Sequence, residues 1–174
     1  MPRPLRRSGG VTYLERAVEQ ALASCADEVV VVIGRRVAHA RDVLEPRARL
    51  KVVVDPLHTE KRAALLATGI RSASVEATAF FAAYGDDRAP AAKEIDQFLA
   101  AASRGHKPLV LRFDKKKRSL LPLLFDRTLK SELLSDVDDE TLRRVVERDP
   151  SRLSLVPVEA KSSPPARGRR KHRS

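Results

Sequence analysis

The chain has 174 residues, 43% of them hydrophobic, which is enough for one ordinary domain with its own core. Its formal net charge of +11 favours anionic binding partners such as nucleotides, nucleic acids or acidic surfaces. No apolar run approaches the ~20 residues of a membrane-spanning helix, and the basic N-terminus lacks the apolar core of a secretory signal. Because Cys25 is the single cysteine, no internal disulfide can form, and we expect a cytoplasmic protein.

The first half of the sequence alternates helix and strand signals. Thr12, with Glu15 three residues later, predicts a capped helix whose apolar stripe runs to Leu22. The run from Val29 to Ile33 has β-branched residues on both faces, which indicates a central strand of a parallel sheet covered by helices. Further along the chain we expect helices at 36–44, 61–72 and 91–103 and strands at 50–54 and 79–83.

The second half continues the alternation with shorter segments. Leu120 to Phe125 contains Pro122, so we expect an edge piece or a turn there rather than a central strand. Strands are expected at 108–113 and 153–158, and helices at 126–134 and 139–148. The whole pattern predicts a three-layer α/β/α domain over residues 1–160 with a mainly parallel sheet. Residues 161–174 carry six positive charges and no acid, which predicts a disordered basic tail.

The candidate site lies where the strand at 79–83 meets the following helix. Tyr84-Gly85-Asp86-Asp87 has turn chemistry, and the helix starts at Pro90. In an open parallel sheet, ligands bind at the carboxyl ends of the strands. Carboxylates at that edge suit Mg²⁺, a hard cation that neutralises nucleotide phosphates. The alternative is that Asp86 and Asp87 only form the turn and cap the helix start.

Other chemistry-bearing residues give no pattern of their own. The four histidines have no His or Cys neighbour at metal-ligand spacing, and Cys25 is interpreted as a small buried hydrophobe. The sequence contains neither a Walker pattern nor a G-x-G-x-x-G pattern. The basic run at 115–118 is typical of a solvated loop that can contact phosphates.

Taken in order, several segments resemble the MobA-like nucleotidyltransferase family, particularly its molybdenum cofactor cytidylyltransferase branch. The longest are GGVTYLERAVEQALASCADEVVVVIG at 9–34, which is similar to the family's "LLERAV … ADEVVVVLG", and FFAAYGDDRAPAAKEIDQFL at 80–99, which is similar to "lvllgDqPlvspeeIdrLl". The resemblance covers residues 2–158. Shorter matches are Val52–Val54 with Asp55-Pro56 ("vvvNP"), Leu65–Ala73 ("SlraGL"), Pro122 with Leu124 and Phe125 ("GhPvLF"), and Leu134-Ser135-Asp136 ("LxGD").

The resemblance implies a Rossmann-like fold of the nucleotide-diphospho-sugar transferase type, and it implies a nucleotidyl-transfer reaction. Family members bind CTP or GTP with Mg²⁺ and transfer CMP or GMP onto a phosphate of a molybdopterin-type cofactor, releasing pyrophosphate. By position, Asp86 would bind the nucleotide and the metal, and Arg3 would bind phosphate. Asp87, Pro122 and Asp136 would lie on the acceptor side, and no residue is assigned a catalytic role.

The departures from the family pattern are as informative as the matches. The family opens with a strand and a loop of the form LAAGxSxRMG, whereas this sequence begins just past that loop. The family's "DiDTPeD" segment, which carries a second metal Asp, is replaced here by the basic tail. Asp87-Arg88 stands where the family has Q-P. We therefore expect an N-terminally truncated domain, without the first strand, with impaired transfer.

Two alternatives stay open. One is a degenerate, non-catalytic domain that binds a partner protein or a nucleotide-like ligand. The other is a nucleic-acid-associated module that uses residues 161–174 and the loop at 115–118. Aromatic residues for base stacking are scarce, so such binding would depend on the nucleic-acid backbone.

Overall fold

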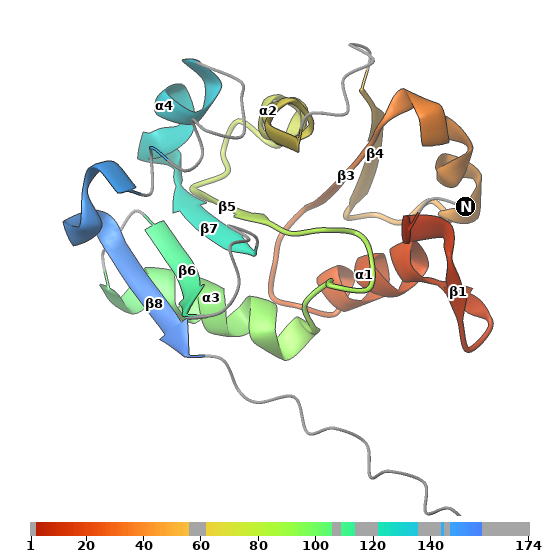
Figure 1. Cartoon of the computed structure of the whole chain (residues 1–174), viewed down its shortest axis with the longest axis horizontal. Coiled ribbons are helices and arrows are strands. Elements are labelled where there is room, and N and C mark those ends of the chain that lie inside the picture. Colours follow the sequence, from red (N-terminus) through yellow and green to blue (C-terminus); the bar gives the residue numbers. More distant parts are fainter. Residues whose placement is uncertain are drawn as a thin grey trace, which may run out of the picture.

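The computed structural model describes residues 3–55, 62–105, 109–113, 122–135, 144 and 147–157 (Figure 1). The elements follow in the order η1 (Arg3–Leu5), β1 (Arg7–Ser8), β2 (Val11–Thr12), α1 (Tyr13–Leu22), β3 (Val29–Ile33), η2 (Arg35–Val43), β4 (Leu50–Val54), α2 (Arg62–Ser72), β5 (Ala79–Ala82), α3 (Ala92–Gly105), β6 (Leu109–Phe113), β7 (Leu123–Asp126), η3 (Arg127–Leu129), α4 (Lys130–Ser135), η4 (Pro150–Arg152) and β8 (Leu153–Pro157), where η marks a 3₁₀ helix. No described helix is long and apolar enough to cross a membrane.

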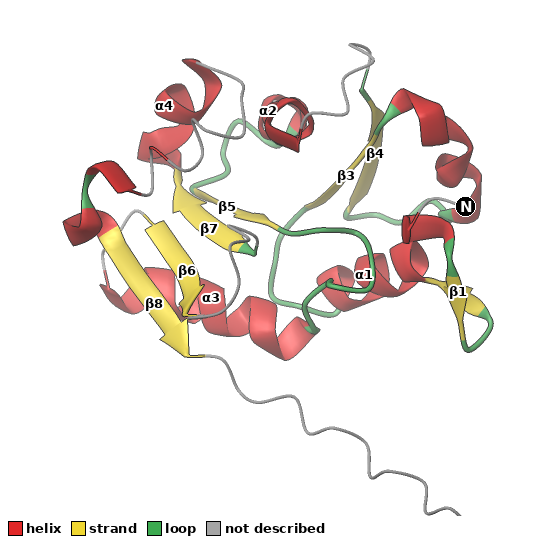
Figure 2. Ribbon diagram, in the orientation of Figure 1, coloured by secondary structure: helices red, strands yellow, loops and turns green. Residues whose placement is uncertain are grey.

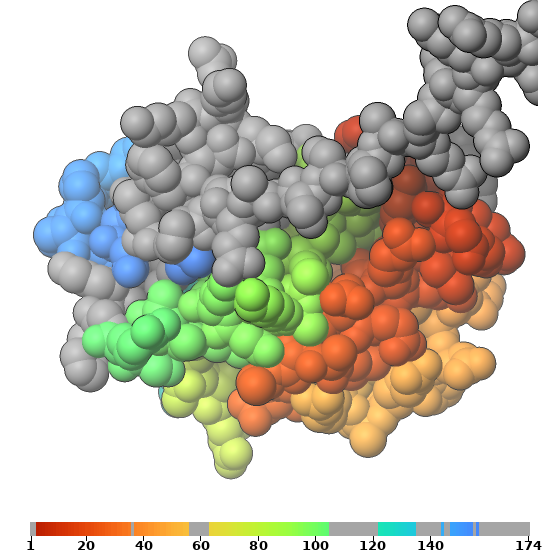
Figure 3. All heavy atoms as spheres, turned by 90° about the horizontal axis from the view of Figure 1, so that it is seen from below, coloured from red at the N-terminus to blue at the C-terminus, as the bar shows by residue number. Residues whose placement is uncertain are grey.

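The predicted α/β class is confirmed, with helices on both faces of the strands (Figure 2). Helices α1 and α3 contact each other on one face, where Figure 3 shows them as neighbouring orange-red and green surfaces. Helices α2 and α4 contact each other on the opposite face. This arrangement is the three-layer architecture that the alternation of elements predicts.

The strands form two main sheet pieces with mixed directions. β3 and β4 pair in parallel, with Val29 opposite Leu50 and Ile33 opposite Val54. The second piece has the order β5-β7-β6-β8, in which β6 and β8 run parallel while β7 is antiparallel to both neighbours. In the described part of the chain, no strand pairs with both pieces.

The expectation that the segment around Pro122 forms an edge piece is wrong. β7 lies between β5 and β6, and its residues Leu123, Leu124 and Phe125 are fully buried. Pro122 directly precedes the strand rather than lying in it, so every residue of β7 keeps its N–H for the sheet. Successive side chains of β7 enter opposite layers: Phe125 stacks on Phe80, with ring centroids 5.2 Å apart, while Leu124 packs with Phe98.

Local sequence explains most helix boundaries. The predicted capping box of α1 is present, because Thr12 Oγ1 accepts from the Glu15 N–H at 3.1 Å and Glu15 Oε2 accepts from the Thr12 N–H at 2.7 Å. The helix expected at 36–44 is instead a 3₁₀ segment, interrupted at Val37 by a backbone outside the helical region. The helix expected at 139–148 and the tail at 161–174 lie mostly or wholly outside the described residues.

The N-terminal hairpin was not predicted from the sequence. A two-residue hairpin joins β1 to β2 through Gly9 and Gly10, whose φ angles are +65° and +89°. Positive φ at both turn positions is the geometry that glycine adopts at low cost, and it matches the twist of the flanking strands. The hairpin leads η1 back to the start of α1.

Candidate functional site

The loop that follows β5 is held against α1. If Gly85 carried a Cβ atom, that atom would lie 3.1 Å from Cδ1 of Leu14 in α1, so the loop passes close to this helix. At the other end of the loop, the Ala92 N–H donates to Oε1 of Gln20 at 3.0 Å. The loop is therefore fixed against α1 before α3 begins, and its acidic residues sit on a supported backbone.

Asp86 is the buried acidic residue of this loop, with a side chain that is 7% exposed. Its Oδ1 accepts from the backbone N–H of Arg88 at 3.0 Å and from Arg88 Nε at 2.9 Å. Its Oδ2 accepts from Arg88 Nη2 at 2.5 Å and from Nε at 3.1 Å. Both carboxylate oxygens are thus engaged by one residue, in the bidentate geometry that an Arg fork favours.

The pKa values of this pair move in opposite directions. Burial alone would raise the pKa of Asp86, but hydrogen bonds from the Arg88 side chain and backbone, with the charges of Arg88 and Arg3, hold it below its ordinary value. The hydrogen bond to Asp86 in turn raises the pKa of Arg88. Asp86 is therefore a carboxylate, and Arg88 a guanidinium, over the whole neutral range.

Arg3 and Asp87 extend the cluster. Nε of Arg3 lies 3.7 Å from Oδ1 of Asp87, and both side chains are about half exposed, at 56% and 42%. Arg3 belongs to η1, which is anchored because Leu5 is buried in a core cluster with Leu14 and Ile33. The structure thus brings together three of the predicted site residues, Arg3, Asp86 and Asp87, from segments more than eighty positions apart.

The residues present do not fit Mg²⁺ in this arrangement. A divalent ion takes oxygen ligands, and both oxygens of Asp86 already accept from Arg88. Within the described residues, no three His, Cys, Asp or Glu side chains are grouped so that they could hold a metal ion. The cation beside Asp86 in this structure is a guanidinium.

The remaining predicted site residues are not brought to this cluster by any described contact. Pro122 is buried at the start of β7. Asp136 and the basic loop at 115–118 lie outside the described residues. Two residues of the site were not predicted: Arg88 and Tyr84, whose ring centroid lies 3.8 Å from Cζ of Arg88. The spacing of Asp86 and Arg88 was the available signal, because an Asp side chain commonly bonds the backbone two residues on.

A second polar feature that sequence reasoning missed is Asp55, directly after β4. Its side chain is completely buried, and Oδ1 accepts from Thr68 Oγ1 of α2 at 2.9 Å. Its Oδ2 has no hydrogen-bond partner among the described residues. Asp55 therefore ties α2 to the end of β4 through one oxygen only.

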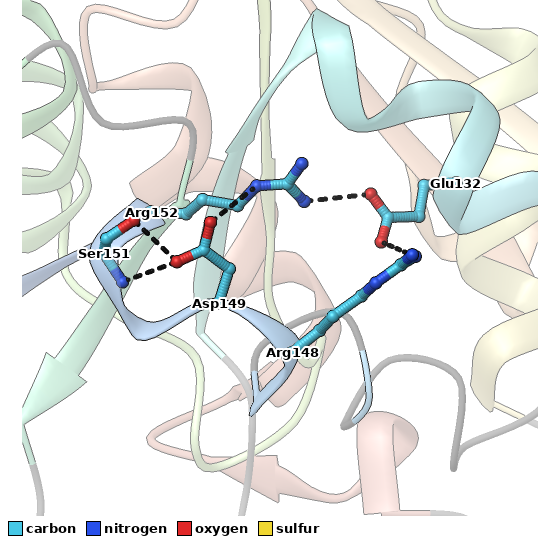
Figure 4. Close-up of polar contacts among 5 residues, drawn as sticks. All are labelled: Glu132, Arg148, Asp149, Ser151 and Arg152. Atoms are coloured by element: carbon cyan, nitrogen blue, oxygen red, sulfur yellow. Dashed lines mark hydrogen bonds and ion pairs between the residues drawn. The ribbon is translucent and has the colours of Figure 1, made fainter.

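A third polar cluster joins α4 to η4 (Figure 4). Arg152 Nη1 donates to Glu132 Oε2 at 3.1 Å and its Nε lies 3.6 Å from Asp149 Oδ2, while Arg148 lies 3.5 Å from Glu132 Oε1. The fourth oxygen, Asp149 Oδ1, accepts from the N–H and Oγ of Ser151. These contacts link α4 to η4 and to the residues just before it.

Comparisons with known proteins identify the kind of domain. A family model described as "MobA-like NTP transferase domain" matches residues 1–153. A comparison with the sequences of curated proteins gives no match.

Solved structures share the fold. The Mycobacterium sp. strain JC1 homologue of the Mycobacterium tuberculosis protein Rv0371c superimposes with a TM-score of 0.76 at 18% identity, covering 92% of this chain and 79% of its own. Rv0371c itself, solved in complex with manganese, gives 0.73 at 19% identity, with 90% and 81% covered. A nucleotidyl transferase from Methanothermobacter gives a TM-score of 0.71 at 23% identity, with 89% of this chain and 74% of its own covered.

Proposed function

Because the chain belongs to the MobA-like NTP transferase domain family, we propose that it binds a nucleoside triphosphate at the loop after β5, and that its nucleotidyl transfer is impaired. The observation that carries the proposal is the cluster of Asp86, Arg88 and Arg3 on this loop and on η1. The guanidinium groups of Arg3 and Arg88, which pair with Asp87 and Asp86 here, are the proposed donors to the phosphate oxygens.

The proposed donor is CTP or GTP, and the proposed acceptor is a phosphate of a molybdopterin-type cofactor. Such a transfer needs alignment and charge neutralisation more than covalent chemistry. The half-exposed Arg3 is the group proposed to contact the phosphates. Asp87, Pro122 and Asp136 are proposed on the acceptor side. Asp86 is proposed on the nucleotide side, where it could hold a metal ion only after Arg88 releases its oxygens.

Impairment is supported by the state of Asp86. Transfer in this class depends on charge stabilisation at the phosphates, to which bound divalent ions contribute. The complex of Rv0371c with manganese supports a divalent ion in that structural neighbour. In this chain both carboxylate oxygens of Asp86 accept hydrogen bonds from Arg88. We therefore expect the chain to bind the nucleotide without transferring its nucleotidyl group.

Calorimetric titration with CTP and GTP, paired with an assay of pyrophosphate release, tests both parts. We expect saturable binding with a dissociation constant above the micromolar range and turnover at the level of a no-protein control, with Mg²⁺ present or absent. Micromolar binding with turnover would contradict impairment. No binding of either nucleotide at millimolar concentration would contradict nucleotide recognition itself.

A second candidate function is a non-catalytic domain that binds nucleic acid or a partner through its basic segments. It is favoured by the net charge of +11, of which residues 161–174 carry a large share. This candidate predicts an affinity for single-stranded RNA that falls steeply with salt. Deleting residues 161–174 should abolish that slope, and a flat slope for the full chain would exclude this candidate.

A further inference from the structure

The occupation of both Asp86 oxygens by a residue of the same loop has consequences for metal binding. A divalent ion must take at least one of these oxygens as a ligand, and both already accept charge-assisted hydrogen bonds. The carboxylate is 7% exposed, so little of its surface is open for an additional ligand. An ion can therefore reach Asp86 only where the guanidinium gives way.

Arg88 is held from a second side as well. Cζ of its guanidinium lies 3.8 Å from the centroid of the Tyr84 ring, within the range of a cation–π interaction. Its backbone N–H also donates to Asp86, so the position of the Arg88 main chain relative to this carboxylate is fixed. Two neighbours and a backbone hydrogen bond thus fix the guanidinium, which distinguishes it from a freely moving surface Arg.

An Arg at this position differs from a metal ion in two respects. The guanidinium carries one charge, which is permanent, and its donors point in fixed directions in one plane. A divalent ion carries two charges and accepts additional oxygen ligands around itself. A site with Arg88 in place neutralises Asp86 but cannot gather phosphate oxygens and a carboxylate around a common centre.

We propose that Arg88 is a built-in cation of this site, which neutralises Asp86 in the position where a divalent ion would be held and excludes that ion until the guanidinium leaves the Tyr84 ring. The inference rests on the proposed function for the choice of site. Metal exclusion is nevertheless a property of the free chain and needs no nucleotide.

The test is a titration of the full, nucleotide-free chain with Mn²⁺ at pH 7, followed by electron paramagnetic resonance of the unbound ion. The proteins are the wild type, Arg88→Gln and Arg88→Ala. Arg71→Gln is the matched control, because it removes the same charge from an exposed position on α2. We expect both Arg88 variants to bind Mn²⁺ about tenfold or more tightly than the wild type, and the control to stay within about twofold of it.

The double variant Asp86→Asn with Arg88→Gln assigns the gain to the carboxylate, and it should bind no better than the wild type. The inference is overturned if the wild type binds Mn²⁺ as tightly as the Arg88 variants. It is also overturned if neither Arg88 variant binds Mn²⁺ while keeping a native circular dichroism spectrum. A gain in Mn²⁺ affinity that survives Asp86→Asn would overturn it as well. Arg88 is 41% exposed, so at least one of its variants should fold. If nucleotide titrations fail while the Mn²⁺ gain appears, only the proposed function falls.

Discussion

At the scale of single residues, the charge state of Asp86 governs the loop after β5. Its lowered pKa means that the ionised form stabilises the folded state. This contribution is complete above the unfolded pKa of about 3.9 and disappears as the pH falls through the lower folded value.

Replacing Asp86 by Asn should therefore have a pH-dependent cost. We expect the free energy of unfolding to fall by about 1–2 kcal/mol at pH 7, a modest figure because Arg88 is partly exposed. The difference between variant and wild type should shrink as the pH is lowered toward 3. Urea unfolding at several pH values measures it, and a difference that is constant with pH would show that the ionised carboxylate does not stabilise the fold.

Asp55 and Thr68 provide a second residue-scale test. Thr68→Val removes the sole described donor to Asp55 Oδ1, and we expect it to lower the free energy of unfolding by about 1–3 kcal/mol. In an Asp55→Asn background the same change should cost less, because a neutral amide is less costly to leave unpaired than a carboxylate. A double-mutant cycle measures the coupling. Equal costs in the two backgrounds would mean that the hydrogen bond does not stabilise Asp55.

At the scale of elements, α1 packs against the loop that carries the candidate site. Leu14 and Gln20 both contact the loop that carries Asp86, so the start of α1 has to be fixed for the loop to be fixed. The capping box of Thr12 and Glu15 performs that function.

Thr12→Ala should lower the free energy of unfolding by about 1 kcal/mol, because the Glu15 N–H at the helix start loses its acceptor, Thr12 Oγ1. Thr12→Ser retains the hydroxyl and is the matched control. Thermal unfolding followed by circular dichroism compares the three proteins. A Thr12→Ala variant as stable as the Ser variant would mean that the cap does not stabilise α1.

At the scale of the whole molecule, the strands are divided between two pieces. β7 has a hydrogen-bonded neighbour on each side and lies in the core, whereas β3 pairs with β4 alone among the described strands. Stability is therefore expected to differ between the two halves.

Hydrogen exchange should resolve this difference. We expect the slowest amides in Leu123–Phe125 of β7, and faster exchange for the amides of β3 that do not face β4. The measurement is native-state exchange followed by NMR, with the amides of β3 that do bond to β4 as the internal reference. Uniform protection across β3 and β7 would indicate that a further strand or partner covers β3.

Much of this fold could be predicted from the sequence, and the features that could not be predicted have physical causes. The Val29–Ile33 strand, the Thr12 capping box and the strand–loop–helix around Asp86 follow from local patterns that tertiary contacts leave intact. The central position of β7 could not be inferred, since a proline beside a strand and a proline inside it look alike until the register is known. Arg88 was missed because the two-residue spacing predicts only its backbone hydrogen bond to Asp86, whereas the direction of its side chain depends on the folded loop.

The most direct measurement is a titration of the ¹⁵N-labelled chain with CTP and GTP, read from its amide resonances. We expect saturable shifts concentrated in Tyr84–Arg88 and around Arg3, and smaller shifts in an Arg3→Ala variant. Saturable shifts confined to other elements, or none at millimolar nucleotide, would contradict the placement of a nucleotide site at the end of β5.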